Sequence, residues 1–313
     1  MYKMNRILIL GQEFVIMGKI CRVIRLRQEW DEDILDPKKI IDELKGKKIR
    51  ADLFTFAQRL PNTEANYPYP MEWDNIAAIP ISTYENWWTN QAFKQVRKNV
   101  RRSERRGVVV KVVEFNDDLV RGIQQIYDET RIRQGTLNTH YGKSFEETKR
   151  ANMTYLERSD FIGAFMQDEL IGFIKLVYTK DKVFARTIAI EGKIRYRGIG
   201  YMHALIAKAV EMCAAKHVPY LVYGKFIYGK KGSDSLTMFK QYNGFRKVNL
   251  PRYYIPLNLK GKILFSLGLH KNLNEILPRF IIRTLLKIRK LYYETRYWKD
   301  FKVERELSKT KED

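Results

Sequence analysis

The stretch KIRYRGIGYM, residues 193–202, places cations and glycines just before an apolar helical pattern. A strand that turns into a helix leaves main-chain N–H groups unpaired at the positive end of the helix dipole. Glycine lets such a backbone approach a ligand closely, because it carries no Cβ. Arg195, Gly198 and Gly200, in the spacing RxxGxG, therefore predict a site for a diphosphate group. A glycine turn that serves packing alone is the alternative.

The elements around this turn follow from the pattern of apolar residues. Two helical patterns, at 117–135 and 144–158, begin at Asp117 and Ser144, which are predicted N-caps. Strands are predicted at 160–167, 170–179 and 182–190, and the first two form a hairpin through a tight turn at Asp168 and Glu169. After the glycine turn we expect a helix at 200–216, a strand at 219–226, a helix at 233–245 that begins at Ser233 or Asp234, and a strand at 246–257.

This order of elements resembles the GNAT acyltransferase superfamily over about residues 116–257. In that family an RxxGxG turn receives the pyrophosphate of acyl coenzyme A. The resemblance implies that Arg197 to Gly200, which include Gly198 and Ile199, supply main-chain donors, and that Arg195 adds charge. It also implies that the strand edge at 187–190, with Ala189 and Ile190, holds the acyl carbonyl.

A second resemblance involves residues 93–114, FKQVRKNVRRSERRGVVVKVVE, and residues 236–245, LTMFKQYNGF. Both look like the Fem-type aminoacyltransferases of peptidoglycan bridge synthesis, which carry two GNAT-like halves and take an amino acid from aminoacyl-tRNA. Lys240 stands at the lysine of a comparable Phe-Lys pair in those enzymes. The intact glycine turn favours acyl coenzyme A as the donor here.

The first third of the chain mixes helices and strands. We expect a helix at 38–45 after Asp36 and Pro37, strands at 51–60 and 75–82, a helix at 83–107 and a strand at 108–115. This part lacks a glycine turn, so the resemblance makes it a degenerate, noncatalytic half. The predicted organisation is a degenerate α/β half at 1–115, a GNAT-like domain with a mixed sheet at 116–258, and a basic helical extension at 259–313.

Charge sets the class of partner. The 313 residues include 58 Lys and Arg against 36 Asp and Glu, a net charge of +22. Such a field attracts nucleic acid, anionic lipid or phosphorylated substrates. Helical spacing puts six cations on one side of the 83–107 helix, opposite Val96 and Val100, as either a solvated face or a site for tRNA, lipid head groups or a diphosphate-linked acceptor. These cations are Lys94, Arg97, Lys98, Arg101, Arg102 and Arg105.

Acyl transfer to an amine needs a proton acceptor, a polarised carbonyl and an acid for the leaving group. Glu191, directly after the third strand, is the predicted base, and an exposed loop carboxylate is the alternative. Lys240 is predicted to neutralise a phosphate or the oxyanion, and a solvated lysine on a short helix is the alternative. Tyr242 or Tyr223 is predicted to act as the acid. His140 is placed near the acceptor, and His203 is interpreted as a surface or packed histidine rather than a catalyst.

Metal and disulfide chemistry is not expected, because Cys21 and Cys213 lie far apart and the four histidines show no ligand spacing. Charged residues interrupt the apolar runs of the N-terminus, so neither a signal peptide nor a membrane span is predicted. We expect a cytoplasmic protein that is peripheral to the inner face of the membrane. The basic helix predicted at 274–298 either docks on the domain through Ile281, Leu285, Ile288 and Tyr292 or lies on the membrane.

The sequence thus predicts an N-acyltransferase that moves an acyl group from acyl coenzyme A to an amine on a small molecule or on a lipid-linked envelope or polysaccharide precursor. An aminoacyl-tRNA-dependent Fem-like enzyme that acts on a peptidoglycan-type precursor is one alternative. A noncatalytic polyanion-binding module with the same fold is another.

Overall fold

The chain divides into two compact units. The computed structural model describes residues 6–47, 49–133, 136–228, 235–271, 279–298 and 302. One unit comprises Met1–Ile76, Ile227–Gly232 and Lys247–Pro278, and the other comprises Ala77–Phe226, Ser233–Arg246 and Arg279–Asp313. This division differs from the predicted boundary at 115/116, because α3 (Lys94–Arg105) and β6 (Val109–Val113) belong to the second unit. There α3 packs on α6 (Tyr201–Ala215), and β6 pairs with β9 (Ser159–Met166).

The first unit has strands in the order β1-β2-β3-β4-β13. Their bounds are Arg6–Ile9, Gln12–Met17, Val23–Leu26, Leu53–Ala57 and Arg246–Pro256, and the helices are α1 (Pro37–Gly46) and α8 (Leu259–Ser266). Phe54, Phe56 and Tyr253 form the centre of its apolar core. α1 begins as the sequence predicts, since the Asp36 side chain accepts a hydrogen bond from the Lys39 N–H.

The second unit has strands in the order β5-β12-β11-β10-β9-β6, and β5 belongs to it from Ala77 onward. The bounds are Met71–Pro80 for β5, Tyr220–Val222 for β12, Phe184–Gly192 for β11 and Glu169–Tyr178 for β10. β11 and β12 run parallel, whereas β9, β10 and β11 are antiparallel. The remaining elements are α2 (Tyr84–Asn86), α4 (Asp117–Tyr127), β7 (Ile132–Arg133), β8 (Thr136–Leu137), α5 (Phe145–Asn152), α7 (Ser235–Tyr242) and α10 (Arg279–Arg296).

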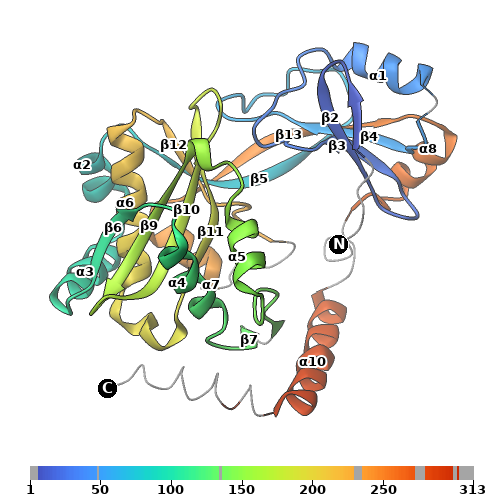
Figure 1. Cartoon of the computed structure of the whole chain (residues 1–313). Helices are drawn as coiled ribbons and strands as arrows, with labels where there is room; N and C mark the ends of the chain where they lie inside the picture. The colour runs from blue at the N-terminus through green and yellow to red at the C-terminus, as the bar shows by residue number, and fades with distance from the viewer. Residues whose placement is uncertain are drawn as a thin grey trace. The chain divides into compact units, whose positions relative to one another are not determined.

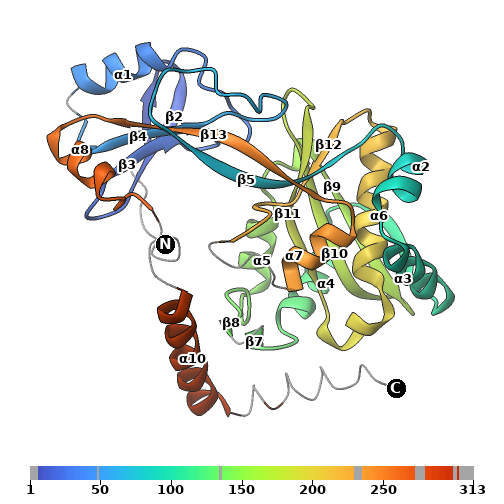
Figure 2. The ribbon, with the colours of Figure 1, turned by 180° about the vertical axis from the view of Figure 1, so that it is seen from behind.

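Helices cover both faces of these strands. Figure 1 shows α4 and α5 in front of β9–β11, and Figure 2 shows α6 and α7 on the opposite face. The α6 side chains Leu205, Ile206 and Cys213 are fully buried. Tyr201, at the start of α6, fills the space above Gly172 and Gly192, where a Cβ would lie 2.5 and 2.3 Å from its side chain. The strands therefore carry glycine at these positions for packing.

The predicted strands at 160–190 and the helix at 200–216 are confirmed, whereas the helix at 83–107 is broken. A π-helical turn spans Trp87–Gln91, and Ala92 is extended before α3 begins. The reason is long-range: Trp87 Nε1 donates to Asn243 O, and the Phe93 N–H donates to Tyr242 O. A continuous helix would lose these contacts.

Smaller predictions also change. The N-cap of α4 is Asn116 rather than Asp117, because the Leu119 N–H donates to Asn116 Oδ1. The predicted cap at Ser144 is confirmed as a capping box with Glu147. The hairpin turns at Gln167 and Asp168, and β10 begins at Glu169.

Strands β1–β3 were not predicted, and the proposed caps Ser233 and Asp234 lie outside the described residues. α10 contacts β8, but of the side chains expected to dock only Ile281 is half-buried. Leu285, Ile288 and Tyr292 are at least half exposed, so they do not form the expected docking face. No helix in the described ranges is both long and apolar enough to cross a bilayer.

Candidate active site

β11 separates from β12 after the first three of its nine residues. The parallel pairing runs from Phe184 with Tyr220 to Arg186 with Val222. Beyond that point the Tyr223 N–H bonds to Ala77 O, so the chain after β12 follows β5 instead. On its other side β11 is bulged, because Leu176 and Lys175 of β10 face Thr187 and Ala189 and leave Ile188 as an extra residue. The strand therefore offers backbone groups at an edge inside the domain.

A pocket of about 340 Å³ lies along this edge. Thr187, Ile188, Ala189, Ile190 and Glu191 form one wall. Lys175, Tyr223 and residues of α4, α5 and the loop between them supply the rest. These additional residues are Tyr127, His140, Ala151 and Asn152. The sequence-predicted residues Ala189, Ile190 and Glu191 and the suggested His140 are thus brought together.

Glu191 is the carboxyl of this pocket. Burial raises its pKa, against the opposing effect of Arg133 and Arg197. Arg133 Nη1 lies 2.6 Å from Glu191 Oε2, and Arg133 Nη2 donates to Gly192 O, which fixes the carboxyl beside the strand end. A carboxyl with a raised pKa is suited to accept and return a proton.

His140 and Tyr127 form the apolar side of the pocket. Their rings stack with centroids 4.4 Å apart. Burial, followed by the nearby charge of Lys143, lowers the pKa of His140 and favours the neutral imidazole. Burial raises the pKa of Tyr127 to about 12, so its hydroxyl stays protonated at neutral pH.

Lys175 is a pocket residue that the sequence analysis did not identify. Its ammonium is buried and contacts Asn152 O at 2.7 Å, Thr154 O and Thr154 Oγ1. Burial lowers its pKa to about 8. An ammonium has three donors, and all three are occupied here, so Lys175 holds the end of α5 rather than an oxyanion. The single lysine in the apolar run LIGFIKLVYT was the available signal.

The glycine turn is largely occupied by contacts of the protein itself. The N–H groups of Ile194 and Arg195 donate to the carboxylate of Glu129. The Arg195 side chain pairs with Glu169, as does Lys193. Burial alone would raise the pKa of Glu169, but hydrogen bonds from Lys193 and Tyr196 hold that pKa below its usual value.

The end of the turn is covered by α3. Gly200 has a φ of +91°, and a Cβ there would lie 2.4 Å from the main-chain oxygen of Asn99. This glycine is therefore required by helix packing. Ile199 is buried, while Arg197 and Gly198 are half-buried.

Lys240 and Tyr242 lie outside the pocket lining. Lys240 is fully buried, donates to Lys225 O at 2.5 Å and sits 4.5 Å from the centre of the Tyr223 ring, which lines the pocket. Tyr242 packs on Phe93, with ring centroids 5.3 Å apart. His203 is packed as interpreted, with Nδ1 3.0 Å from Asn243 Oδ1.

The basic side of α3 borders a separate concavity of about 640 Å³. Five of the six predicted cations line it, and Arg102 does not. The lining consists of Lys94, Arg97, Lys98, Arg101, Glu104 and Arg105. Arg97 also donates to Trp88 O and Ala92 O, so it stabilises the break before α3. Within the described ranges, no three His, Cys, Asp or Glu side chains are arranged to hold a metal ion.

Solved structures share this fold at low sequence identity. The C-terminal domain of a candidate lysylphosphatidylglycerol synthetase from Agrobacterium fabrum matches with a TM-score of 0.59 and 15% identity, over 85% of this chain and 88% of that chain. L-PGS from Bacillus licheniformis matches with 0.56 and 14%, over 84% and 88%. FemX matches with 0.57 and 9%, over 84% and 90%. No family model and no curated protein matches the sequence.

These likenesses confirm the predicted fold class. The chain has a mixed α/β, GNAT-like fold of the kind found in FemX and in the lysylphosphatidylglycerol synthetase domain.

Proposed function

We propose that this protein is an acyltransferase whose reaction takes place in the pocket along β11. The observation that carries the proposal is the separation of β11 from β12 beside a half-buried carboxyl. The strand edge from Thr187 to Ile190 presents backbone groups to the pocket, and Glu191 lies at its end. A main-chain N–H at such an edge can polarise a carbonyl oxygen.

The chemistry requires few groups. The neutral amine of the acceptor attacks the carbonyl carbon, a C–N bond forms, and the C–S bond of a thioester breaks. The proton released from nitrogen passes to the Glu191 carboxylate, directly or through water, and the leaving thiolate takes up a proton. The raised pKa of Glu191 suits this exchange.

Acyl coenzyme A is the donor in this proposal. The RxxGxG turn is intact and leads directly into α6, a helix of 15 residues whose N-terminus favours anions. Glu129 and Asn99 already contact the two ends of the turn. In this proposal the diphosphate therefore binds at Arg197 and Gly198, which are half-buried.

Aminoacyl-tRNA is a second candidate donor, favoured by two observations. Gly200 and the first N–H groups of the turn are already occupied, which leaves a smaller site for a diphosphate. The α3 concavity offers five cations and one acid, Glu104, as an anionic backbone would require. In this case the bond broken is the ester of the aminoacyl group.

The acceptor in both cases is an amine, either on a small molecule or on a lipid-linked precursor. This choice of acceptor is suggested by the names of two solved structures that share the fold, a lysylphosphatidylglycerol synthetase domain and FemX. If the acceptor is lipid-linked, the reaction takes place at the inner face of the membrane. Lys240, behind Tyr223, is a positioning residue for the pocket wall in this proposal.

Binding of the donor tests the proposal. Coenzyme A should raise the melting temperature of the native protein and not that of a Gly198→Trp variant. If charged tRNA is retained instead, with steep salt dependence that Lys98→Glu and Arg101→Glu abolish, the second donor is correct. If the protein binds anions but neither releases a thiol nor transfers an aminoacyl group to any amine, it is a noncatalytic binding module, and the proposal of an enzyme is refuted.

A further inference from the structure

α8 and the turn between β2 and β3 expose large apolar side chains. Leu259, Ile263 and Leu267 are 73%, 51% and 64% exposed, and Ile20, in the turn, is 75% exposed. The three helix positions are four residues apart and so lie on one side of the helix. On the other side Leu264 is buried in a cluster with Cys21 and Leu53. The helix is therefore anchored while its outer side faces solvent.

The turn and the helix present these side chains together. Lys260 Nζ donates to Ile20 O at 2.8 Å, which holds the tip of the turn against α8. Cys21, the next residue, packs against Leu264. We call the set Ile20, Leu259, Ile263 and Leu267 the α8 surface.

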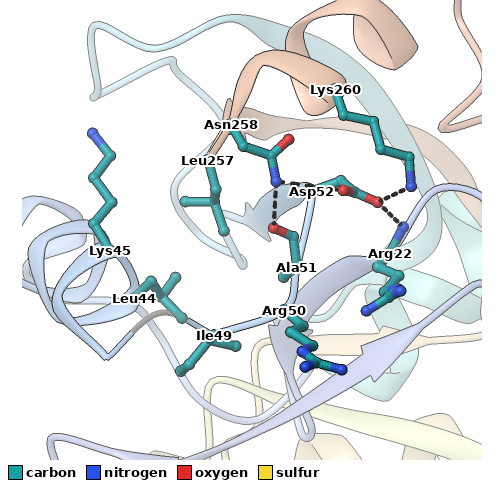
Figure 3. Close-up of a pocket in the computed structure, with 10 residues that line it drawn as sticks. All are labelled: Arg22, Leu44, Lys45, Ile49, Arg50, Ala51, Asp52, Leu257, Asn258 and Lys260. Carbon is teal, nitrogen blue, oxygen red and sulfur yellow. Dashed lines mark hydrogen bonds and ion pairs between the residues drawn. The ribbon is translucent and has the colours of Figure 1, made fainter.

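A basic pocket of about 590 Å³ adjoins the α8 surface in the same unit. Figure 3 shows four cations around it: Arg22, Lys45, Arg50 and Lys260. The remaining lining residues are Leu44, Ile49, Ala51, Asp52, Leu257 and Asn258. Lys260 contacts the α8 surface at Ile20 and also lines the pocket, so the two features are continuous.

Asp52, the one acid of the pocket, is already satisfied by the protein. It accepts the Arg22 N–H at 2.9 Å and lies 3.1 Å from Lys260 Nζ. Burial acts to raise its pKa, but the hydrogen bonds from Arg22, Lys260 and Asn258 bring that pKa below its usual value. Among the described residues, no ion pair or hydrogen bond engages the exposed side chains of Arg22, Lys45 and Arg50.

We propose that this part of the first unit docks on an anionic lipid bilayer. The α8 surface enters the interfacial region of the lipid, and the basic pocket holds the phosphate of an anionic head group. Apolar side chains flanked by lysine and arginine suit such an interface, because each kind faces the layer of the bilayer that favours it. The proposal concerns docking alone and stands whether or not the acyl transfer proposed above is correct.

Charge and apolarity together favour lipid over other partners. A nucleic acid would engage the cations but leave Leu259, Ile263 and Leu267 in water. A second copy of this chain would cover the apolar side chains, but each copy carries a net charge of +22, so the approach is repulsive.

Sedimentation of the full chain with vesicles tests the proposal. Vesicles of 30% phosphatidylglycerol in phosphatidylcholine should bind the native protein at least tenfold more tightly than phosphatidylcholine alone. Ile263→Glu with Leu267→Glu, and separately Lys45→Glu with Arg50→Glu, should each weaken this binding at least tenfold, because each cation near the surface contributes about a fivefold factor. All four side chains are exposed, so the melting temperatures should stay within about 3 °C of the native value.

Two matched controls separate the site from general effects. Val109→Glu with Val112→Glu changes similarly exposed apolar residues on β6, and Arg246→Glu with Lys247→Glu makes the same charge change at two exposed cations of β13. Both controls should bind within threefold of native. The proposal is overturned if the controls lose as much binding as the test variants, or if the test variants bind like native. It is also overturned if Ile263→Glu with Leu267→Glu dissociates a dimer and leaves vesicle binding intact.

Discussion

The strand-edge pocket of the second unit and the basic pocket of the first use their polar groups in opposite ways. Along β11 the charged groups are paired and withdrawn from solvent: the half-buried Glu191 with Arg133, and the buried Lys175 with three oxygens. In the basic pocket Arg22, Lys45 and Arg50 are exposed to solvent. Burial shifts proton affinities and fixes geometry, which chemistry needs. Docking needs cations that attract a partner, and exposed cations do so without a fixed geometry.

Replacement of Glu191 gives the largest expected effect. Glu191→Gln should lower the transfer rate by about 100-fold or more, because the proton acceptor is lost. The native rate should rise with pH through the raised pKa of Glu191. Asp118→Asn, at a carboxylate that is 90% exposed, is the control and should keep the native rate.

The stability of the same variant sharpens the comparison. The raised pKa of Glu191 means that the folded protein disfavours the charged carboxylate. The contribution of Glu191 to the free energy of unfolding therefore falls as pH rises above the pKa that Glu191 has in the unfolded chain. Glu191→Gln should therefore melt no lower than native at pH 8. A lower melting temperature would show that Glu191 serves the fold through Arg133.

Lys175→Met should destabilise the second unit by about 2–4 kcal/mol, because it leaves buried acceptors at Asn152 and Thr154 without a donor. The pKa of Lys175 is lowered to about 8, so the unfolded chain binds more protons than the fold above that pH. The stability gap between native and variant should thus widen as pH rises from 8 to about 10. Denaturant unfolding at several pH values measures it, and a constant gap would contradict the buried position of the ammonium.

Gly200→Ala tests whether α3 covers the glycine turn. Its Cβ would meet Asn99 O, whereas Gly11, with a φ of +79°, has nothing within 4 Å. Gly11→Ala therefore measures only the cost in stability of placing a non-glycine residue at a positive φ. Gly200→Ala should cost about 1–3 kcal/mol more than Gly11→Ala in the free energy of unfolding. Equal costs would mean that α3 does not seal the turn.

The smallest effect is expected in the basic pocket. Arg50→Ala and Lys45→Ala should each change the free energy of unfolding by less than about 0.5 kcal/mol, because both side chains are exposed and engage no described residue. If thermal or denaturant unfolding shows a larger loss of stability, these cations help to stabilise the fold, and the contrast between the two pockets disappears.

The sequence predicted the parts that depend on local pattern. The strands at 160–190 and the helix after the glycine turn have regular apolar spacing, and Ser144 and Asp36 are strong N-terminal caps. The strands β1–β3 are short and carry charged residues, so their pattern was weak. The break before α3 depends on Asn243 and Tyr242, about 150 residues away, and no local pattern contains it.

The site was predictable to the same extent. Glu191 was predicted from its place after a strand, and Ala189 and Ile190 from the GNAT resemblance; the structure puts all three in one pocket. The glycine turn was assigned to a ligand from its residue types. In the structure, Glu129 from the turn after α4 binds two of its N–H groups, and Asn99 of α3 packs against Gly200. Lys175 was missed because a lysine in a buried strand needs partners that only the fold supplies.

The most direct test is a crystal structure with an unreactive donor, either a ketone analogue of acyl coenzyme A or an amide analogue of an aminoacyl adenosine. The account predicts that the donor carbonyl oxygen lies within hydrogen-bond distance of a main-chain N–H between Thr187 and Ile190, with Glu191 beside the carbonyl carbon. A carbonyl bound outside the pocket along β11 would contradict it.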